Sequence, residues 1–127
     1  MSDRQARAMK SHLLAAALFI LVGTAYWTVV SVLGGTPEPW DAPGYWTVAY
    51  PGVLLLSAVA GLVRPAGAWA WGTLLVLAQV VVVVIATGVG PLLAAGLLYA
   101  VVLSLPALSI SSIAGWWRKR RTTRGAA

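Results

Sequence analysis

Four long apolar runs occupy most of the chain, and short polar or Pro/Gly-rich segments separate them. The runs cover residues 13–33, 45–63, 67–87 and 92–113. The segments between them carry the sequences Gly34-Gly35-Thr36-Pro37, Arg64-Pro65 and Gly88-Val89-Gly90-Pro91. An α-helix needs about 20 apolar residues to cross the hydrocarbon core of a bilayer, and each run has about that length. The hydropathy pattern therefore predicts four membrane-spanning helices.

Helices fit these runs better than β-strands. None of the runs alternates apolar and polar residues, as a barrel strand of about 9–11 residues does. In lipid, only helices and closed barrels satisfy all backbone hydrogen bonds. We therefore expect an all-α fold, an integral membrane four-helix bundle in antiparallel up-down order, as one membrane domain over residues 1–127. Pro51 falls in the first turns of the second span or marks a kink, and Pro106 predicts a kink in the fourth.

Polar, basic segments flank the spans at both ends of the chain. Residues 1–12 lead into the first span, and residues 114–127 form a basic tail whose end we expect to be disordered. The N-terminal region also has the parts of a signal peptide, namely Arg4, Arg7 and Lys10 before an apolar stretch and Gly23-Thr24-Ala25 as a cleavage site. Because the apolar run continues to Leu33, a full spanning length, we favour an uncleaved helix.

All nine Lys and Arg residues fall on one side of this arrangement. Threading the spans back and forth brings the cations of residues 1–12 together with Arg64 and with those of the basic tail. The opposite side receives Glu38 and Asp41 and no cation. Because cytoplasmic segments carry the excess of Lys and Arg, the N and C termini are both predicted to be cytoplasmic.

The composition supports a membrane environment. The 127-residue chain is 60% apolar and 9% charged, whereas soluble domains carry about 25% charged residues. The formal net charge of +6 lies at helix ends, which fits anionic headgroups better than nucleic acid. The chain has no cysteine, so disulfides and thiolate metal sites are excluded, and one histidine with three carboxylates leaves little for another metal site. We expect no metal and no cofactor.

Aromatic residues mark both borders of the predicted bundle. Those near the outer face are Tyr26, Trp27, Trp40, Tyr45, Trp46 and Tyr50, and those near the inner face are Trp69, Trp71, Trp116 and Trp117. Such amphipathic rings favour the headgroup zone. Trp116 and Trp117 precede Arg118, Lys119, Arg120 and Arg121. These six residues are predicted to anchor the chain to anionic lipid, with about 1 kcal/mol per cation; docking of a cytosolic partner is the alternative.

Gln79 is the most polar side chain in the middle of a span. An unpaired amide is costly in hydrocarbon, so Gln79 needs a neighbour. Residues 79 and 99 lie at nearly equal distances from the turn at 88–91. Tyr99 is therefore predicted at the depth of Gln79, as its candidate hydrogen-bond partner. The pair is either a clamp between helices, worth about 1 kcal/mol, or a polar contact for a ligand inside the bundle.

Small residues recur at four-residue spacing in the second and fourth spans. They are Ser57 and Gly61, and Gly96, Ala100 and Ser104. Small side chains let helices approach closely, either within the bundle or at a dimer face.

Other candidate chemistry is sparse. Apart from tyrosine, the spans hold no ionisable side chain, whereas pumps, coupled transporters and voltage sensors keep one there. His12 is predicted at the inner border and Glu38 with Asp41 at the outer border, so these groups do not share one site. No nucleophile elbow, P-loop, dinucleotide fingerprint or zinc motif is present.

The order of several residues resembles that of uncharacterised small four-span bacterial inner-membrane proteins. The residues that carry the resemblance are Tyr50-Pro51, Arg64-Pro65, Trp69, Gly72, Gln79 and Leu105-Pro106. The resemblance covers most of residues 45–115 and implies a multi-pass protein of the bacterial inner (cytoplasmic) membrane, without an activity, substrate or site. The chain lacks the Arg/Asn/Phe pattern of small fluoride channels and the membrane Glu of small multidrug exporters.

The sequence leaves three hypotheses for function. The first is a non-enzymatic integral membrane protein, an accessory or assembly subunit that acts through helix–helix contacts. The second is a homo-oligomeric channel or carrier for a small neutral or lipophilic solute, with Gln79, Tyr99 and Thr73 along its path. The third and weakest is a lipid-modifying enzyme that uses Glu38, Asp41 or His12. The expected partners are a bilayer with anionic headgroups and another membrane protein or a second copy, and not nucleic acid.

Overall fold

The computed structural model describes residues 2–126, with side chains to residue 124, and this part of the chain is helical without a β-strand. Its elements are α1 (Asp3–Gly34), the 3-10 turn η1 (Pro39–Asp41), the π-helical turn η2 (Tyr45–Ala49), α2 (Tyr50–Val63), α3 (Ala68–Thr87) and α4 (Pro91–Ala126). Four helical segments, with η2 and α2 joined as one, are long and apolar enough to cross a membrane. The prediction of four long apolar helices is therefore confirmed.

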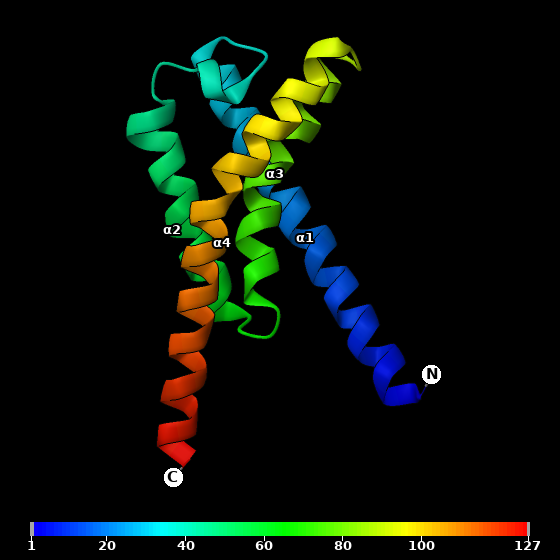
Figure 1. Cartoon of the computed structure of the whole chain (residues 1–127), viewed down its shortest axis with the longest axis vertical. Coiled ribbons are helices and arrows are strands. Elements are labelled where there is room, and N and C mark those ends of the chain that lie inside the picture. Colours follow the sequence, from blue (N-terminus) through cyan, green and yellow to red (C-terminus); the bar gives the residue numbers. More distant parts are fainter. Residues whose placement is uncertain (1, 127) are drawn as a thin grey trace.

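Helix α3 is the centre of the bundle. It packs against α1, α2 and α4, and α4 also packs along α2. Helix α1 packs extensively against α3, with a smaller contact to η1. Figure 1 shows α1 leaning away from the other helices toward its N-terminus, with both ends of the described chain at the same end of the bundle. Helix α1 therefore has α3 as its main packing partner.

The outer helices are longer than the apolar runs. Helix α1 begins at Asp3, ten residues before the predicted span, because Ser2 and Gln5 form a capping box at its start. Gly35 ends it with a φ of 68°, a left-handed conformation that glycine adopts without strain. Helix α4 continues through the basic tail to Ala126. The polar ends are thus helical extensions beyond the spans. The helix continues to Ala126 into the end of the tail, for which we expected disorder, and Ala127 lies outside the described residues.

Glycines mark the closest approaches between helices. A Cβ atom at Gly23 of α1 would lie 2.7 Å from the Cβ of Ala78 on α3. A Cβ at Gly72 of α3 would collide with the backbone of α4 at Ala107, and Gly61 of α2 faces the backbone of α4 at Ser111 in the same way. These absent side chains let α3 and α4 pack backbone to backbone.

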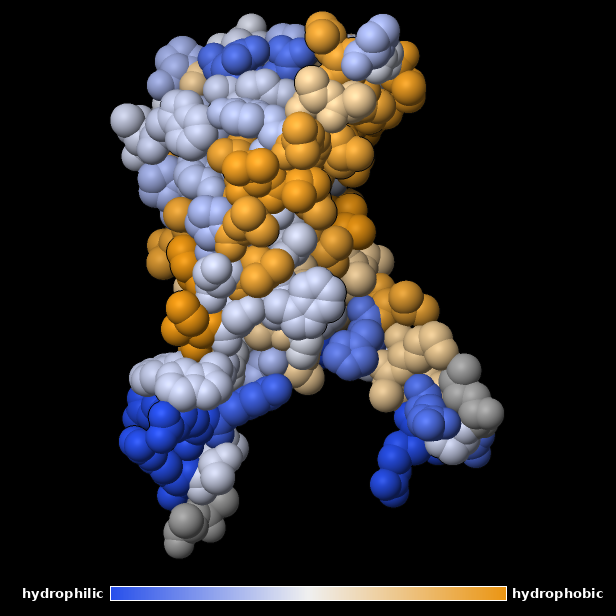
Figure 2. Space-filling model, viewed as in Figure 1, coloured by the Kyte–Doolittle hydropathy of each residue, from blue (hydrophilic) through white to orange (hydrophobic). Residues whose placement is uncertain are grey.

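The exterior shows the division between an apolar body and polar ends. Figure 2 shows apolar side chains over the middle of this face and strongly hydrophilic ones on the two helix ends that protrude from the bundle. In water such an apolar exterior would be a large exposed patch, whereas in a bilayer it faces lipid.

Candidate functional site

Gln79 lies at the centre of the bundle, on a face of α3 that other helices cover. Its side chain has no exposed surface. The Tyr45 hydroxyl donates a hydrogen bond to Gln79 Oε1 at 3.2 Å. Gln79 Nε2 is buried and has no hydrogen-bond partner among residues 2–126. The amide is therefore held at its oxygen only, by the hydroxyl of Tyr45 at the start of the second span.

The hydroxyl that reaches Gln79 belongs to Tyr45 and not, as residue counting around the 88–91 turn predicted, to Tyr99. Tyr99 packs edge-on against Trp40, with ring centroids 5.6 Å apart, and is 39% exposed. Counting from a turn gives the depth of a residue along a helix but not the direction in which its side chain points. A ligand contact by Gln79 or Tyr99 stays a prediction.

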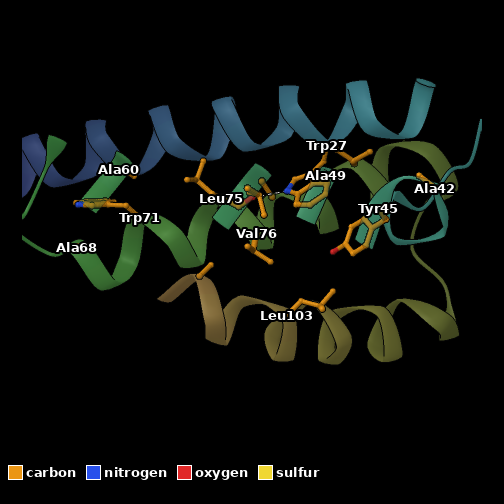
Figure 3. Packing of buried hydrophobic residues seen from close by; sticks show 14 residues of the cluster. Trp27, Ala42, Tyr45, Ala49, Ala60, Ala68, Trp71, Leu75, Val76 and Leu103 are labelled. Carbon is orange, nitrogen blue, oxygen red and sulfur yellow. Dashed lines mark hydrogen bonds between the residues drawn. The ribbon is translucent and has the colours of Figure 1, made fainter. Parts of the chain in front are cut away.

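Aromatic rings surround the bond between Tyr45 and Gln79. Tyr45 stacks with Trp27 and with Tyr50, at centroid separations of 5.4 Å and 5.7 Å. Trp27 and Tyr45 have no exposed surface, and both lie in the apolar cluster of Figure 3. The sequence indicated these rings as border residues, and their role in the core was missed. Their position inside predicted spans, rather than beside charged residues, was the available signal.

Polar atoms of this aromatic cluster hold the four helices together. Trp27 Nε1 donates to Leu75 O at 2.8 Å, Tyr26 OH donates to Ala49 O at 2.5 Å, and Tyr50 OH donates to Leu103 O at 2.6 Å. The first bond joins α1 to α3 (Figure 3) and the last joins α2 to α4. Without competing water, each such bond contributes about 0.6–2 kcal/mol. The arrangement is that of an interhelical clamp.

Two prolines shape the backbone that these side chains contact. Pro51 has no N–H, and the chain before it forms a π-helical turn in which Ala49 N donates to Gly44 O at 3.0 Å. Pro106 lies inside α4, where its ring disrupts the hydrogen-bond ladder one turn earlier. The Tyr50 hydroxyl supplies a donor to the carbonyl of Leu103 in that turn. A neighbouring helix thus supplies a hydrogen bond in the turn that Pro106 weakens.

The connection between α2 and α3 gathers residues from three helices at the basic end. Trp71 Nε1 donates to the carbonyls of Arg64 and Ala66 at 3.0 Å and 3.2 Å. The His12 ring stacks on Trp71 at a centroid distance of 6.0 Å, and the Arg64 guanidinium carbon lies 5.5 Å from the ring centroid. Arg64 Nη2 donates to Ser11 Oγ at 2.8 Å. Arg64 therefore ties α1 to the end of α2.

The six predicted lipid anchors lie on the exposed, C-terminal part of α4. Arg118 Nη1 donates to the carbonyls of Leu62 and Val63, and so caps the end of α2. Arg120 and Arg121 each form a cation–π contact with the tryptophan one helical turn before it. Arg120 lies over Trp116 at 4.8 Å, and Arg121 lies over Trp117 at 4.9 Å. Lys119 is exposed. Arg118 thus has a packing role that the sequence did not reveal, and lipid anchoring by the six residues stays a prediction.

Glu38 and Asp41 lie in the connection between α1 and η2, at the end of the bundle away from the termini (Figure 1). Partial burial raises the pKa of the Glu38 carboxyl, and the neighbouring Asp41 raises it further. His12, beside Trp71, lies near the opposite end. Within residues 2–126, no group of three His, Asp or Glu side chains is placed to hold a metal ion.

Two of the grooves that border α1 separate this helix from the second span and from the segment before it. A groove of 680 Å³ lies between residues 22–34 of α1 and the segment 42–49, with almost wholly apolar walls. A groove of 540 Å³ lies between residues 7–19 of α1 and the end of α2. Gln79 lines neither groove.

The fold and this interior define a multi-pass membrane protein whose helices are joined by buried aromatic and amide groups. No family model matches the chain, and no curated protein or solved structure matches it either. The expectation of a bacterial inner-membrane protein therefore rests on the order of residues in the sequence.

Proposed function

We propose that this chain is a non-enzymatic accessory or assembly subunit of a larger complex in the bacterial inner membrane, acting through helix–helix contacts. The observation that supports this most is the attachment of α1. Its main packing partner is α3, and 17% of its apolar window is buried, compared with 22% for α4, 28% for the second span and 44% for α3. Most of α1 is thus free for lipid or another protein, and the apolar groove of 680 Å³ beside it accommodates side chains of an adjacent helix.

The proposed orientation places the basic end in the cytoplasm. Both helix extensions and the connection at residues 64–67 lie at that end (Figure 1). All nine Lys and Arg residues belong to these segments, whereas Glu38 and Asp41 lie at the other end. The excess of cations on cytoplasmic segments supports this orientation.

The alternative, a homo-oligomeric channel or carrier for a small neutral or lipophilic solute, gains less support from the interior. Gln79 and Tyr45 are fully buried and bonded to each other. Thr73 Oγ1 donates to Trp69 O within its own helix, and Tyr99 packs against Trp40. These polar groups serve contacts between or within helices. A channel or carrier of this kind would therefore need a solute path between copies of the chain.

Affinity purification from native membranes in a mild detergent tests the proposal. We expect a second membrane protein to co-purify in fixed stoichiometry. A lone homo-oligomer that conducts a small solute after reconstitution into liposomes would contradict the proposal and support the alternative.

A bulky substitution in the apolar groove sharpens this test. Ala25 is exposed and lines the groove, so Ala25→Trp fills it without replacing a core side chain. Leu55, which is 69% exposed on α2, provides the matched control Leu55→Trp. We expect Ala25→Trp to lower the yield of the partner severalfold at an unchanged yield of this chain. Equal recovery with both variants would rule out this face of α1 as the contact.

A further inference from the structure

The groove at the basic end combines cations with an apolar wall. Arg7, Lys10 and Arg64 line it together with Ser11, and its volume is 540 Å³. Its sides come from the N-terminal half of α1 and the end of α2. We propose that this groove binds one anionic phospholipid of the inner leaflet, with the phosphate at the three cations and an acyl chain along the apolar wall.

Two of the three acidic side chains of the chain are far from the cations of the groove. Glu38 and Asp41 lie at the opposite end of the bundle, and only Asp3, in the first turn of α1, lies one helical turn from a groove cation, Arg7. Arg64 is half-buried, and its Nε is buried without a hydrogen-bond partner among residues 2–126. A guanidinium with a free N–H binds phosphate oxygens through charge-assisted hydrogen bonds.

The apolar wall continues from the cations toward the middle of the membrane. Lys10, Leu14 and Leu18 are spaced four residues apart on α1, so they form one stripe along the helix. Leu14 and Leu18 are 62% and 56% exposed. Phe19 and Val63 also line the groove. A charged rim above an aliphatic stripe matches the shape of a phospholipid, whereas free phosphate would use the rim only.

In the neighbouring groove between α2 and α4, both lining cations already have contacts within the chain. The Arg118 guanidinium binds the carbonyls of Leu62 and Val63, and the Arg121 guanidinium lies over the Trp117 ring. Arg7 and Lys10 are exposed, and neither side chain donates a hydrogen bond within residues 2–126. The groove beside α1 therefore has free donors, as basic pockets that bind acidic lipid headgroups do.

Native mass spectrometry of the delipidated full chain in detergent tests this inference. The probes are dioleoyl phosphatidylglycerol and dioleoyl phosphatidylcholine, which share acyl chains and differ in net charge. We expect one phosphatidylglycerol adduct, formed with an affinity at least about fivefold above that of phosphatidylcholine. Equal retention of the two lipids would overturn the proposal.

Removal of the two free cations locates the site. Arg7→Gln/Lys10→Gln changes exposed side chains only, so the bundle is expected to remain folded. Lys119→Gln/Arg124→Gln removes the same charge from the exposed end of α4. We expect the first variant to lose most of the preference for phosphatidylglycerol and the second to keep it. An equal loss in both would indicate diffuse attraction and contradict a defined site.

Competition with glycerol phosphate distinguishes a lipid site from a simple anion site. We expect glycerol phosphate at the concentration of the lipid to leave the adduct intact, because it lacks the acyl contact. Displacement would contradict the lipid proposal. The inference rests on membrane embedding of the chain but not on its role as a subunit, so it can fail or succeed independently of any co-purifying protein.

Discussion

Single residues in the interior act mainly as connectors between helices. Tyr45 reaches Gln79, Trp27 reaches the carbonyl of Leu75, and Arg118 reaches the end of α2. Each donor comes from a different element than its acceptor, so the polar atoms specify which helices are neighbours. In a bilayer this matters because apolar surfaces alone distinguish neighbours poorly from lipid.

The bond between Tyr45 and Gln79 leads to a prediction about stability. Tyr45→Phe leaves the Gln79 amide with no partner on either side, whereas adding Gln79→Leu removes that polar group from the apolar interior. We therefore expect the double variant to be more stable than Tyr45→Phe alone, by about 1 kcal/mol. Unfolding by SDS titration in mixed micelles measures this. The single variant Gln79→Leu completes the comparison. If the double variant loses as much unfolding free energy as Tyr45→Phe and Gln79→Leu lose together, the clamp is contradicted.

Sequence reasoning identified Gln79 as a residue that needs a partner but not which residue supplies it. Tyr99 was chosen by depth alone, whereas Tyr45 reaches Gln79 because the π-helical turn before Pro51 brings its ring into the core. In that turn Tyr45 stacks with Trp27 and Tyr50, residues that come from different helices. The hydropathy of the sequence contains no direct signal of this arrangement.

The sequence predicts the bounds of the inner helices most accurately. The second span agrees with residues 45–63 and the third differs by one residue, because Arg64-Pro65 and Gly88 end helices for local steric reasons. The outer helices extend into their polar ends, where a capping box and Arg118 support them. Hydropathy gives the membrane-crossing part of a helix, not its full length.

The glycine at the contact between α3 and α4 gives a prediction at this scale. In Gly72→Ala, the new Cβ collides with the backbone of Ala107, so we expect a loss of about 1–3 kcal/mol in the free energy of unfolding. Gly90→Ala is the matched control, because no heavy atom lies within 4 Å of its added Cβ. SDS titration of both variants provides the comparison. Equal stability of the two would mean that α3 and α4 are not packed this closely.

The whole molecule is organised by the contrast between its two ends. Two basic helix extensions and the α2–α3 connection lie at one end, and the connection that contains Glu38 and Asp41 lies at the other (Figure 1). Helix α1 leans away from the bundle, which leaves an apolar groove in one half and a basic groove in the other. The proposed partner contact and the proposed lipid site both follow from the one-sided packing of α1 against α3.

The proposed topology has all four helices crossing the membrane, with the basic end in the cytoplasm. The chain has no cysteine, so single cysteines can be labelled in intact cells with a membrane-impermeant maleimide. We expect Pro37→Cys and Val89→Cys to react from outside, and Ala6→Cys, Ala66→Cys and Thr123→Cys to react only after the membrane is opened. Labelling of Ala6→Cys and Thr123→Cys from opposite sides, or of Ala66→Cys together with Val89→Cys, would contradict the account.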